Sequence, residues 1–131
     1  MIVLDSSAIV AILSRESGYE SLLATVTNAD RCALSALTFF ETAIVLFARK
    51  REAGLQDLAK FVEFAEAEII PFDQLAAETA LEAFKTFGKG IHSKSRLNLC
   101  DCAAYALSKS LNAPLLFKGH DFAETDVEIA R

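Results

Sequence analysis

Tryptophan is absent from this chain of 131 residues, and cysteine, histidine, proline and methionine are scarce. The three cysteines cannot all pair with one another, and nothing in the sequence suggests export, so a disulfide-stapled secreted fold is excluded. Cys100 and Cys102 lie two residues apart in an expected helix, where their side chains point away from each other. A zinc site that they would form with His92 and His120 is therefore disfavoured, and the cysteines fit reduced thiols in the cytoplasm.

No signal peptide and no convincing membrane span are apparent in the sequence. No basic cluster precedes the first apolar run, and Asp5 interrupts that run. The longest apolar stretch, residues 32–48, is only marginally long enough to cross a bilayer and carries Glu41 in its middle, at a cost of about 2.5–3.5 kcal/mol. Since the hydrophobic content of 53% suffices for one continuous core, we expect a single cytoplasmic domain over residues 1–131.

The sequence also has no excess of basic residues. It contains 18 acidic and 13 basic residues, and its net charge is −5. This balance alone argues against a nucleic-acid partner. The distribution qualifies that argument: four acids around a metal would leave the remainder nearly neutral, with basic residues at 49–51 and between 85 and 96. Such basic segments would suit a phosphodiester substrate, and ordinary solvated faces are the alternative.

The first seven residues form the motif around which the chain is organised. Residues 1–4 predict a buried strand, Asp5 follows it, and Ser6 and Ser7 are expected to cap a helix over residues 8–13. Ligands of open α/β sheets bind beyond the carboxyl ends of the strands, which makes Asp5 a candidate site residue. A simple turn or N-cap role for Asp5 is the alternative.

Strands and helices are expected to alternate along the whole chain. This order predicts an α/β fold, a three-layer α/β/α sandwich with a mainly parallel central sheet of about five short strands. Beyond the first strand we expect strands at 31–34, 68–72, 115–117 and 127–129, and helices around 22–26 and over 35–53, 56–67, 73–87 and 99–111. Gly54 is expected to end the helix that Ser35 caps, and Asp73 and Asn98 to cap later helices.

Three further acids occupy informative positions. Glu41 falls on an apolar helical stripe with Leu37, Ile44 and Ala48. An acid on such a face needs a partner, and a buried salt bridge with an arginine is the alternative to a role in the site. Asp101 lies in the first turn of a helix, where a capping-box role is the alternative to a ligand role. Asp121 follows a glycine turn just past a strand.

Asp5, Glu41, Asp101 and Asp121 are therefore expected to converge at one edge of the sheet. Carboxylates about 4 Å apart repel by about 4 kcal/mol per pair at an effective dielectric constant near 20, so the cluster requires cations. Oxygen ligands select Mg²⁺ or Mn²⁺, and such a site would activate water for attack on phosphorus. The loop-like segment 88–96 and the following turn supply candidate substrate contacts, namely Lys89, Lys94, Arg96 and His120.

The motifs VLDSSAIVAIL and LNLCDCAAYALSKSLNAPLLFKGHDFAETDV, with the helix that carries Glu41, resemble the PIN-domain toxins of bacterial type II toxin–antitoxin systems, the VapC family. The resemblance implies a Mg²⁺-dependent endoribonuclease, usually a homodimer, restrained by a VapB-type antitoxin that alone brings the pair to operator DNA. The family's acidic quartet falls on Asp5, Glu41, Asp101 and Asp121. Ser7 matches the hydroxyl that supports the first acid, Asp126 matches a further acid near the metal, and Cys100 departs from the glycine of many members.

Two other functions remain open from the residues. A metal-dependent phosphatase or phospho-acceptor module would also place Asp5 at a strand end, but a second Asp two residues further on is missing. A non-catalytic PIN-like binding partner would not need the intact quartet.

Overall fold

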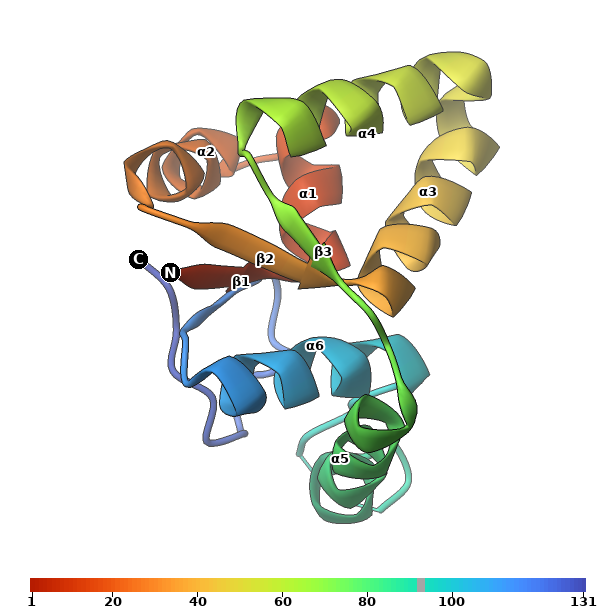
Figure 1. Cartoon of the computed structure of the whole chain (residues 1–131), viewed down its shortest axis with the longest axis vertical. Coiled ribbons are helices and arrows are strands. Elements are labelled where there is room, and N and C mark those ends of the chain that lie inside the picture. Colours follow the sequence, from red (N-terminus) through yellow and green to blue (C-terminus); the bar gives the residue numbers. More distant parts are fainter. Residues whose placement is uncertain (92–93) are drawn as a thin grey trace.

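The sheet of this protein is parallel throughout and lies between two layers of helices (Figure 1). A computed structural model describes residues 1–91 and 94–131, so the predicted loop 88–96 contains two residues, 92 and 93, outside the described residues, and His92 is one of them. The strand order is β3-β2-β1-β4. The strands are β1 (Ile2–Leu4), β2 (Cys32–Ser35), β3 (Glu68–Ile70) and β4 (Leu115–Leu116).

Six helices connect and flank these strands in the described part of the chain, so the predicted α/β sandwich is confirmed. Figure 1 shows α1 to α4 on one face of the sheet and α5 and α6 on the other. The helices are α1 (Ser6–Leu13), α2 (Tyr19–Asn28), α3 (Ala36–Lys50), α4 (Glu52–Phe64), α5 (Gln74–Phe87) and α6 (Leu99–Leu111). None of them is long and apolar enough to cross a membrane.

The C-terminal segment does not form the expected fifth strand. Where the sequence predicts a strand at 127–129, the described residues show a single parallel bridge between Leu115 and Ile129. Its neighbour β4 has only two residues, which leaves little edge for further pairing. The sheet therefore has four strands instead of about five.

Two hydrophobic cores lie on opposite faces of the sheet. Ile2 and Leu4 belong to the core under α1, α2 and α4, whereas Val3 belongs to the core with α5 and α6. Successive side chains of a strand point to opposite faces, so β1 contributes to both cores. This burial on both faces explains the unbroken apolar run before Asp5 and places Asp5 where the run leaves the core.

The predicted caps are confirmed at three helices and wrong at one. Ser35 accepts a hydrogen bond from Leu37 N, Asp73 from Ala76 N, and Asn98 from Asp101 N. At α1 the cap is Asp5, which accepts from Ser7 N, and neither serine serves as the N-cap. The helix begins earlier than predicted because the carboxylate itself satisfies its first free N–H groups.

The predicted helix over 35–53 is present as α3, but its predicted end at Gly54 is wrong. The helix α3 ends at Lys50, Arg51 takes a left-handed φ of 54°, and α4 begins at Glu52, so Gly54 lies inside α4. A Cβ atom at Gly54 would lie 2.3 Å from the carbonyl oxygen of Leu46. Gly54 therefore allows α4 to cross α3 at close range, and the Arg51 guanidinium stacks over the Phe47 ring at 5.4 Å.

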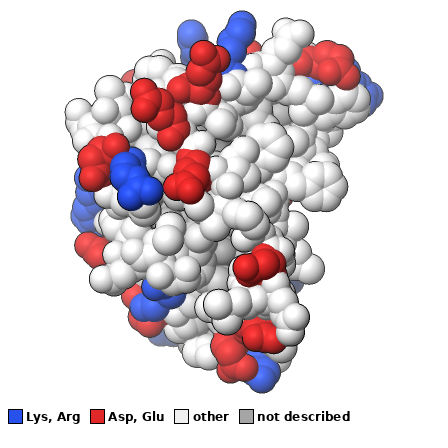
Figure 2. Space-filling model, viewed as in Figure 1, with Lys and Arg blue, Asp and Glu red and all other residues white. Residues whose placement is uncertain are grey.

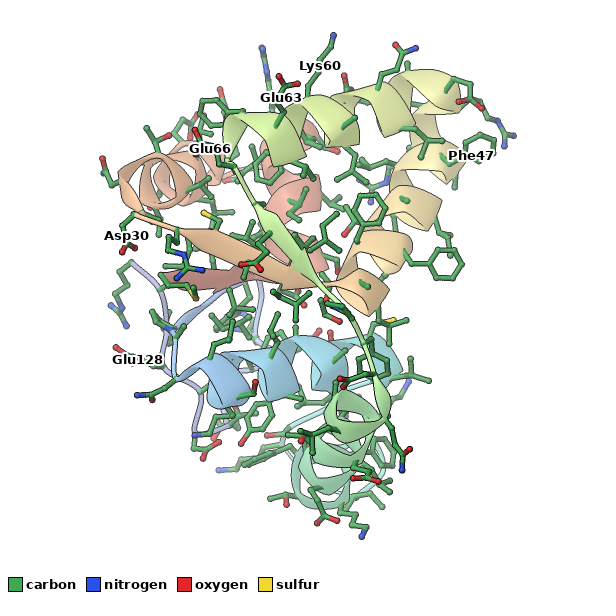
Figure 3. All side chains as sticks on the ribbon, in the orientation of Figure 1. Asp30, Phe47, Lys60, Glu63, Glu66 and Glu128 are labelled. Carbon is green, nitrogen blue, oxygen red and sulfur yellow. The ribbon has the colours of Figure 1, made fainter. Side chains whose placement is uncertain are left out.

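Replacing Gly54 by alanine is expected to destabilise the protein. The contact with the Leu46 carbonyl outweighs the helix propensity gained, and overpacking of this kind costs about 1–3 kcal/mol of unfolding free energy. Urea denaturation of Gly54→Ala measures the loss. Glu63→Ala, an outward-facing change on the same helix (Figure 3), is the control and should stay within about 0.5 kcal/mol of the parent. Equal stability of Gly54→Ala and the parent would contradict the close crossing.

Candidate active site at the carboxyl edge of the sheet

Asp5 is the most deeply placed of the predicted site acids. It follows β1, a central strand, and is only 2% exposed. Its Oδ2 accepts hydrogen bonds from Ser7 N at 3.0 Å and from Ser7 Oγ at 2.6 Å, while its Oδ1 is buried without a hydrogen-bond partner. Burial raises the pKa of Asp5 to about 6, against the lowering effect of the Ser7 hydrogen bonds.

Asp101 approaches Asp5 from the first turn of α6. It forms the predicted capping box: Asp101 N donates to Asn98 Oδ1 at 2.8 Å, and Asn98 N donates to Asp101 Oδ2 at 3.0 Å. Burial, together with the charges of Asp5, Asp121 and Glu41, raises the pKa of Asp101 to about 7, against the lowering effect of the hydrogen bond from Asn98 N. Asp101 is thus both a capping residue and a member of an acidic cluster.

Glu41 reaches this cluster from α3, although the predicted stripe is not the buried face of that helix. The buried side chains are Thr38, Thr42 and Leu46, whereas Ile44 is 53% exposed. Glu41 is half-buried at the margin, and its Oε1 is inaccessible and lacks a hydrogen-bond partner. No basic side chain in the described ranges 1–91 and 94–131 forms a salt bridge with Glu41, so the alternative of a buried arginine pair is wrong.

The remaining predicted residues lie around this cluster or away from it. Asp121 is exposed in the turn after β4 and acts electrostatically on Asp101, with exposed His120 beside it. Asp126 is engaged elsewhere: the Tyr105 hydroxyl donates to its Oδ1, and Lys109 Nζ lies 3.1 Å from its Oδ2. Exposed side chains of the segment before α6 are Lys89, Lys94 and Arg96.

The four acids form an electrostatic cluster, not a finished coordination sphere. Within residues 1–91 and 94–131, no group of three His, Cys, Asp or Glu side chains is arranged to hold a metal ion. The donor set nevertheless fits a hard divalent cation, because Asp5 Oδ1 and Glu41 Oε1 are buried carboxylate oxygens with no partner. Nearby positive charge would offset the repulsion that raises the pKa of Asp101.

Two contacts at this edge were missed by the sequence reasoning. Lys118 N, just after β4, donates to Ser7 Oγ at 2.9 Å, so Ser7 connects Asp5 to a segment more than a hundred residues away. The Cys100 thiol lies near Glu41, and burial together with the charge of Glu41 raises the pKa of that thiol. Neither contact has a sequence signal, because each depends on how separate elements pack.

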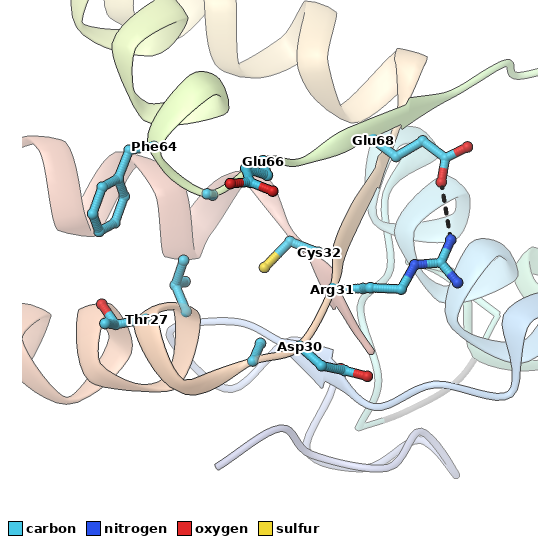
Figure 4. A pocket seen from close by; sticks show the side chains of 10 residues that line it. Thr27, Asp30, Arg31, Cys32, Phe64, Glu66 and Glu68 are labelled. Carbon is cyan, nitrogen blue, oxygen red and sulfur yellow. Dashed lines mark hydrogen bonds and ion pairs between the residues drawn. The ribbon is translucent and has the colours of Figure 1, made fainter.

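Two other cavities lie apart from the acids. A polar cavity of about 480 Å³ opens at the amino end of β2, where Asp30, Glu66 and Glu68 surround buried Cys32 and Arg31 pairs with Glu68 (Figure 4). An apolar cavity of about 540 Å³ lies between α5 and α6 and is lined by Phe72, Ala77, Ala80, Leu81, Phe84, Leu99 and Cys102. Neither contains a member of the quartet, and Cys102 faces this second cavity while Cys100 faces Glu41.

The four-stranded parallel sheet, its flanking helices and the acidic cluster define a class of protein. A family model described as PIN domain matches residues 2–128, so the chain belongs to the PIN domain family. Within that family it falls among the VapC ribonucleases: it is 38% identical over 125 residues to VapC ribonuclease Mb0640 of Mycobacterium bovis, covering 95% of each chain.

Solved structures show the same fold at lower identity. The crystal structure of Mycobacterium tuberculosis VapC20, a sarcin-ricin loop cleaving toxin, matches with a TM-score of 0.79 at 15% identity, over 97% of this chain and 96% of that one. VapBC2 from Rickettsia felis, bound to a DNA fragment from their promoter, matches with a TM-score of 0.71 at 20% identity, over 98% and 96%. The resemblance in the sequence to VapC PIN-domain toxins is thereby confirmed.

The raised pKa values predict that the metal-free protein loses stability as the pH rises. Between the ordinary aspartate pKa of 3.8 and values of about 6 for Asp5 and about 7 for Asp101, the folded chain keeps protons that the unfolded chain has released. The contribution of these two groups to the free energy of unfolding is therefore largest near pH 4 and falls up to about pH 7.

Urea denaturation in a chelating buffer at several pH values measures this effect. Asp5→Asn is expected to flatten the decline because the amide does not titrate. Asp73→Asn is the matched control, since Asn also caps helices and Asp73 is exposed. The same pH dependence in Asp5→Asn and the parent would contradict the raised pKa of Asp5.

Proposed function

We propose that this protein is a Mg²⁺-dependent endoribonuclease, the toxin of a VapBC-type toxin–antitoxin pair. Membership of the VapC ribonucleases supports ribonuclease activity. The observation that carries the proposal is the Asp5 carboxyl, 2% exposed with an unpartnered Oδ1, in electrostatic contact with Glu41 and Asp101. Such a group is costly unless a cation binds it.

Each acid has a distinct part in the proposed site. Asp5 and Asp101 would bind Mg²⁺ directly, Glu41 and Asp121 would complete the ligand set or hold its waters, and Mn²⁺ would be a substitute. Bound metal would supply an activated water and stabilise charge on the leaving oxygen of the phosphodiester. Ser7 orients Asp5 through its hydroxyl, and the Asn98 capping box orients Asp101.

RNA would approach this edge along the segment that precedes α6. Lys89, Lys94 and Arg96 are exposed there, and His120 lies in the turn that carries Asp121. Their positive charge would offset the acidic cluster and bind backbone phosphates, with His120 as an additional contact. The N-termini of α1 and α3, which follow the carboxyl ends of β1 and β2, add partial positive charge at the same edge.

The partners we propose are a VapB-type antitoxin, a second copy of the chain and operator DNA reached only through the antitoxin, all in the cytoplasm. The VapBC2 neighbour with promoter DNA supports the pairing. Exposed apolar side chains offer surface for protein partners: Phe40, Ile44 and Phe47 are exposed on α3. Figure 3 shows Phe47 pointing outward from this helix, and Figure 2 shows largely uncharged surface on that side of the molecule. Exposed patches of this kind are typical of protein interfaces, and this one borders Glu41.

Asp5→Asn and Asp101→Asn are expected to abolish RNA cleavage while the fold remains intact. Each amide keeps an oxygen that can accept the capping hydrogen bond but loses the charge that attracts Mg²⁺. The assay incubates purified protein with bulk tRNA and ribosomal RNA, with Mg²⁺ or with excess chelator, and maps the ends produced. Asp73→Asn should cleave like the parent.

The same preparation separates the proposed nuclease from its rivals. Full Mg²⁺-dependent cleavage by either variant would refute the assigned roles. Hydrolysis of a small phosphate ester without RNA cleavage would favour a phosphatase. If the parent hydrolyses neither substrate, with Mg²⁺ or with chelator, a non-catalytic binding partner would be favoured.

The double variant Lys89→Ala/Arg96→Ala is expected to raise the KM for RNA more than it lowers kcat. Each lost phosphate contact should also reduce the slope of log KM against log salt concentration by about one. Lys60→Ala, which removes one positive charge from the outer face of α4 (Figure 3), is the control and should leave the salt slope unchanged. An unchanged salt slope in the double variant would exclude these side chains as phosphate contacts.

A further inference from the structure

Two side chains of α6 bind Asp126 and tie the C-terminal segment to that helix. The Tyr105 hydroxyl donates a hydrogen bond to Asp126 Oδ1, and Lys109 Nζ lies 3.1 Å from Asp126 Oδ2. Tyr105 is 8% exposed, whereas the side chains of Lys109 and Asp126 are 45% and 59% exposed. Exposed ion pairs contribute little stability, while a buried hydroxyl needs a partner. The hydrogen bond from Tyr105 is therefore the more important of the two contacts.

The residues that bind Asp126 share a face of α6 with Asp101. Tyr105 and Lys109 follow Asp101 at intervals of four residues, and each interval spans about 6 Å along the helix. Asp121 acts electrostatically on Asp101, at the beginning of the helix, and Asp126 is bound one to two turns further on. The segment from Asp121 to Asp126 therefore runs along this face of α6.

The chain before this segment is fixed at the site itself. Asp5 N donates to the carbonyl oxygen of Leu116 at 3.0 Å, and Lys118 N donates to Ser7 Oγ at 2.9 Å. The turn that carries Asp121 thus lies between two fixed points, one beside the buried carboxylate and the other on α6.

The segment between these points is closed on itself. Phe122 is 2% exposed, and its ring centroid lies 5.0 Å from that of Phe117. The amide and the hydroxyl of Thr125 both donate to the carbonyl oxygen of Phe122, at 3.1 and 2.7 Å. Because these bonds join the two ends of the segment, the position of Asp126 also determines that of Asp121, which directly precedes Phe122.

We propose that Tyr105 and Asp126 are positioning residues, which hold the turn carrying Asp121 against α6 so that Asp121 and Asp101 face the same divalent cation. The inference rests on the proposed metal-dependent function. It assigns Asp126 to this anchor, whereas the family resemblance places an acid at that position near the metal. Loss of contacts that orient metal ligands typically weakens metal binding by about 10- to 100-fold.

Hydrogen exchange of the metal-free chain, measured by mass spectrometry in chelator, tests the anchor itself. Tyr105→Phe and Asp126→Ala should each speed exchange over residues 120–127 by about 3- to 10-fold, the effect expected from loss of one hydrogen bond. Tyr19→Phe removes the other tyrosine hydroxyl, and Glu124→Ala removes an exposed acid from the same segment. Both controls should exchange like the parent. Parent-like exchange of Tyr105→Phe would overturn the inference.

Tyr105→Phe is expected to remain folded. The phenylalanine keeps the ring that packs at a centroid distance of 5.6 Å from Phe87, and only the hydroxyl is lost. Urea denaturation in chelator checks this expectation. Asp126→Ala tests the same contact from its exposed side, so the core does not change in that variant.

Mn²⁺ binding, measured by electron paramagnetic resonance, distinguishes an anchor from a metal ligand. An anchor predicts that Tyr105→Phe weakens binding by about tenfold although it removes no acid. A ligand role for Asp126 predicts that Tyr105→Phe, by releasing the carboxylate, leaves the affinity unchanged or higher. That result would overturn the inference, as would a loss in Asp126→Ala no greater than in Glu124→Ala.

A double-variant cycle shows whether the two residues act together. In an Asp126→Ala background, Tyr105→Phe should cause little further loss of Mn²⁺ affinity, because its acceptor is gone. Full additivity of the two losses would contradict the shared anchor. If the parent does not bind Mn²⁺, the proposed function fails, while hydrogen exchange in chelator still decides whether the anchor holds the turn.

Discussion

The Asp5 carboxyl is buried at the end of a central strand with one of its two oxygens unpartnered, and the rest of the site follows from that constraint. Ser7 satisfies Oδ2 through its amide and its hydroxyl, and that hydroxyl in turn accepts a hydrogen bond from Lys118 N. The N-terminal strand, the first helix and the segment after β4 are thereby joined at one carboxylate. Among residues 1–91 and 94–131 no group donates a hydrogen bond to Oδ1, and this unpartnered oxygen is what supports the proposed binding of a cation.

Capping and metal binding are compatible roles for the same aspartates. Asp5 is the N-cap of α1, and Asp101 is the N3 residue of the capping box of α6. Each hydrogen bond to backbone N–H groups uses Oδ2, and these bonds fix the direction of the carboxyl group. The choice between a capping residue and a ligand, which the sequence alone leaves open, is therefore not a true alternative at either position. A carboxylate that caps a helix is already held in one orientation, in which its other oxygen is available to bind a metal ion.

The sequence predicted those elements whose signals are local. The caps at Ser35, Asp73 and Asn98 were found because a single side chain and the next helical turn suffice to define them. It misassigned the junction of α3 and α4, because Gly54 lies where α4 passes close to Leu46 of α3 and does not end a helix. It also misread the buried face of α3, because Thr38 and Thr42 are inside while Ile44 is outside. The position of the α3–α4 junction and the buried face of α3 both depend on how separate helices pack against each other.

By itself the sequence determined that strands and helices alternate and that acids follow the strands or begin the helices, because apolar periodicity and capping act over a few residues. The strands pair in parallel, as predicted, so their carboxyl ends lie at one edge of the sheet. Only the tertiary structure decided that Asp5 Oδ1 and Glu41 Oε1 lack hydrogen-bond partners among residues 1–91 and 94–131, and that Asp126 is engaged by Tyr105 and Lys109. Those facts depend on contacts between residues far apart in the chain, and no local pattern encodes such contacts.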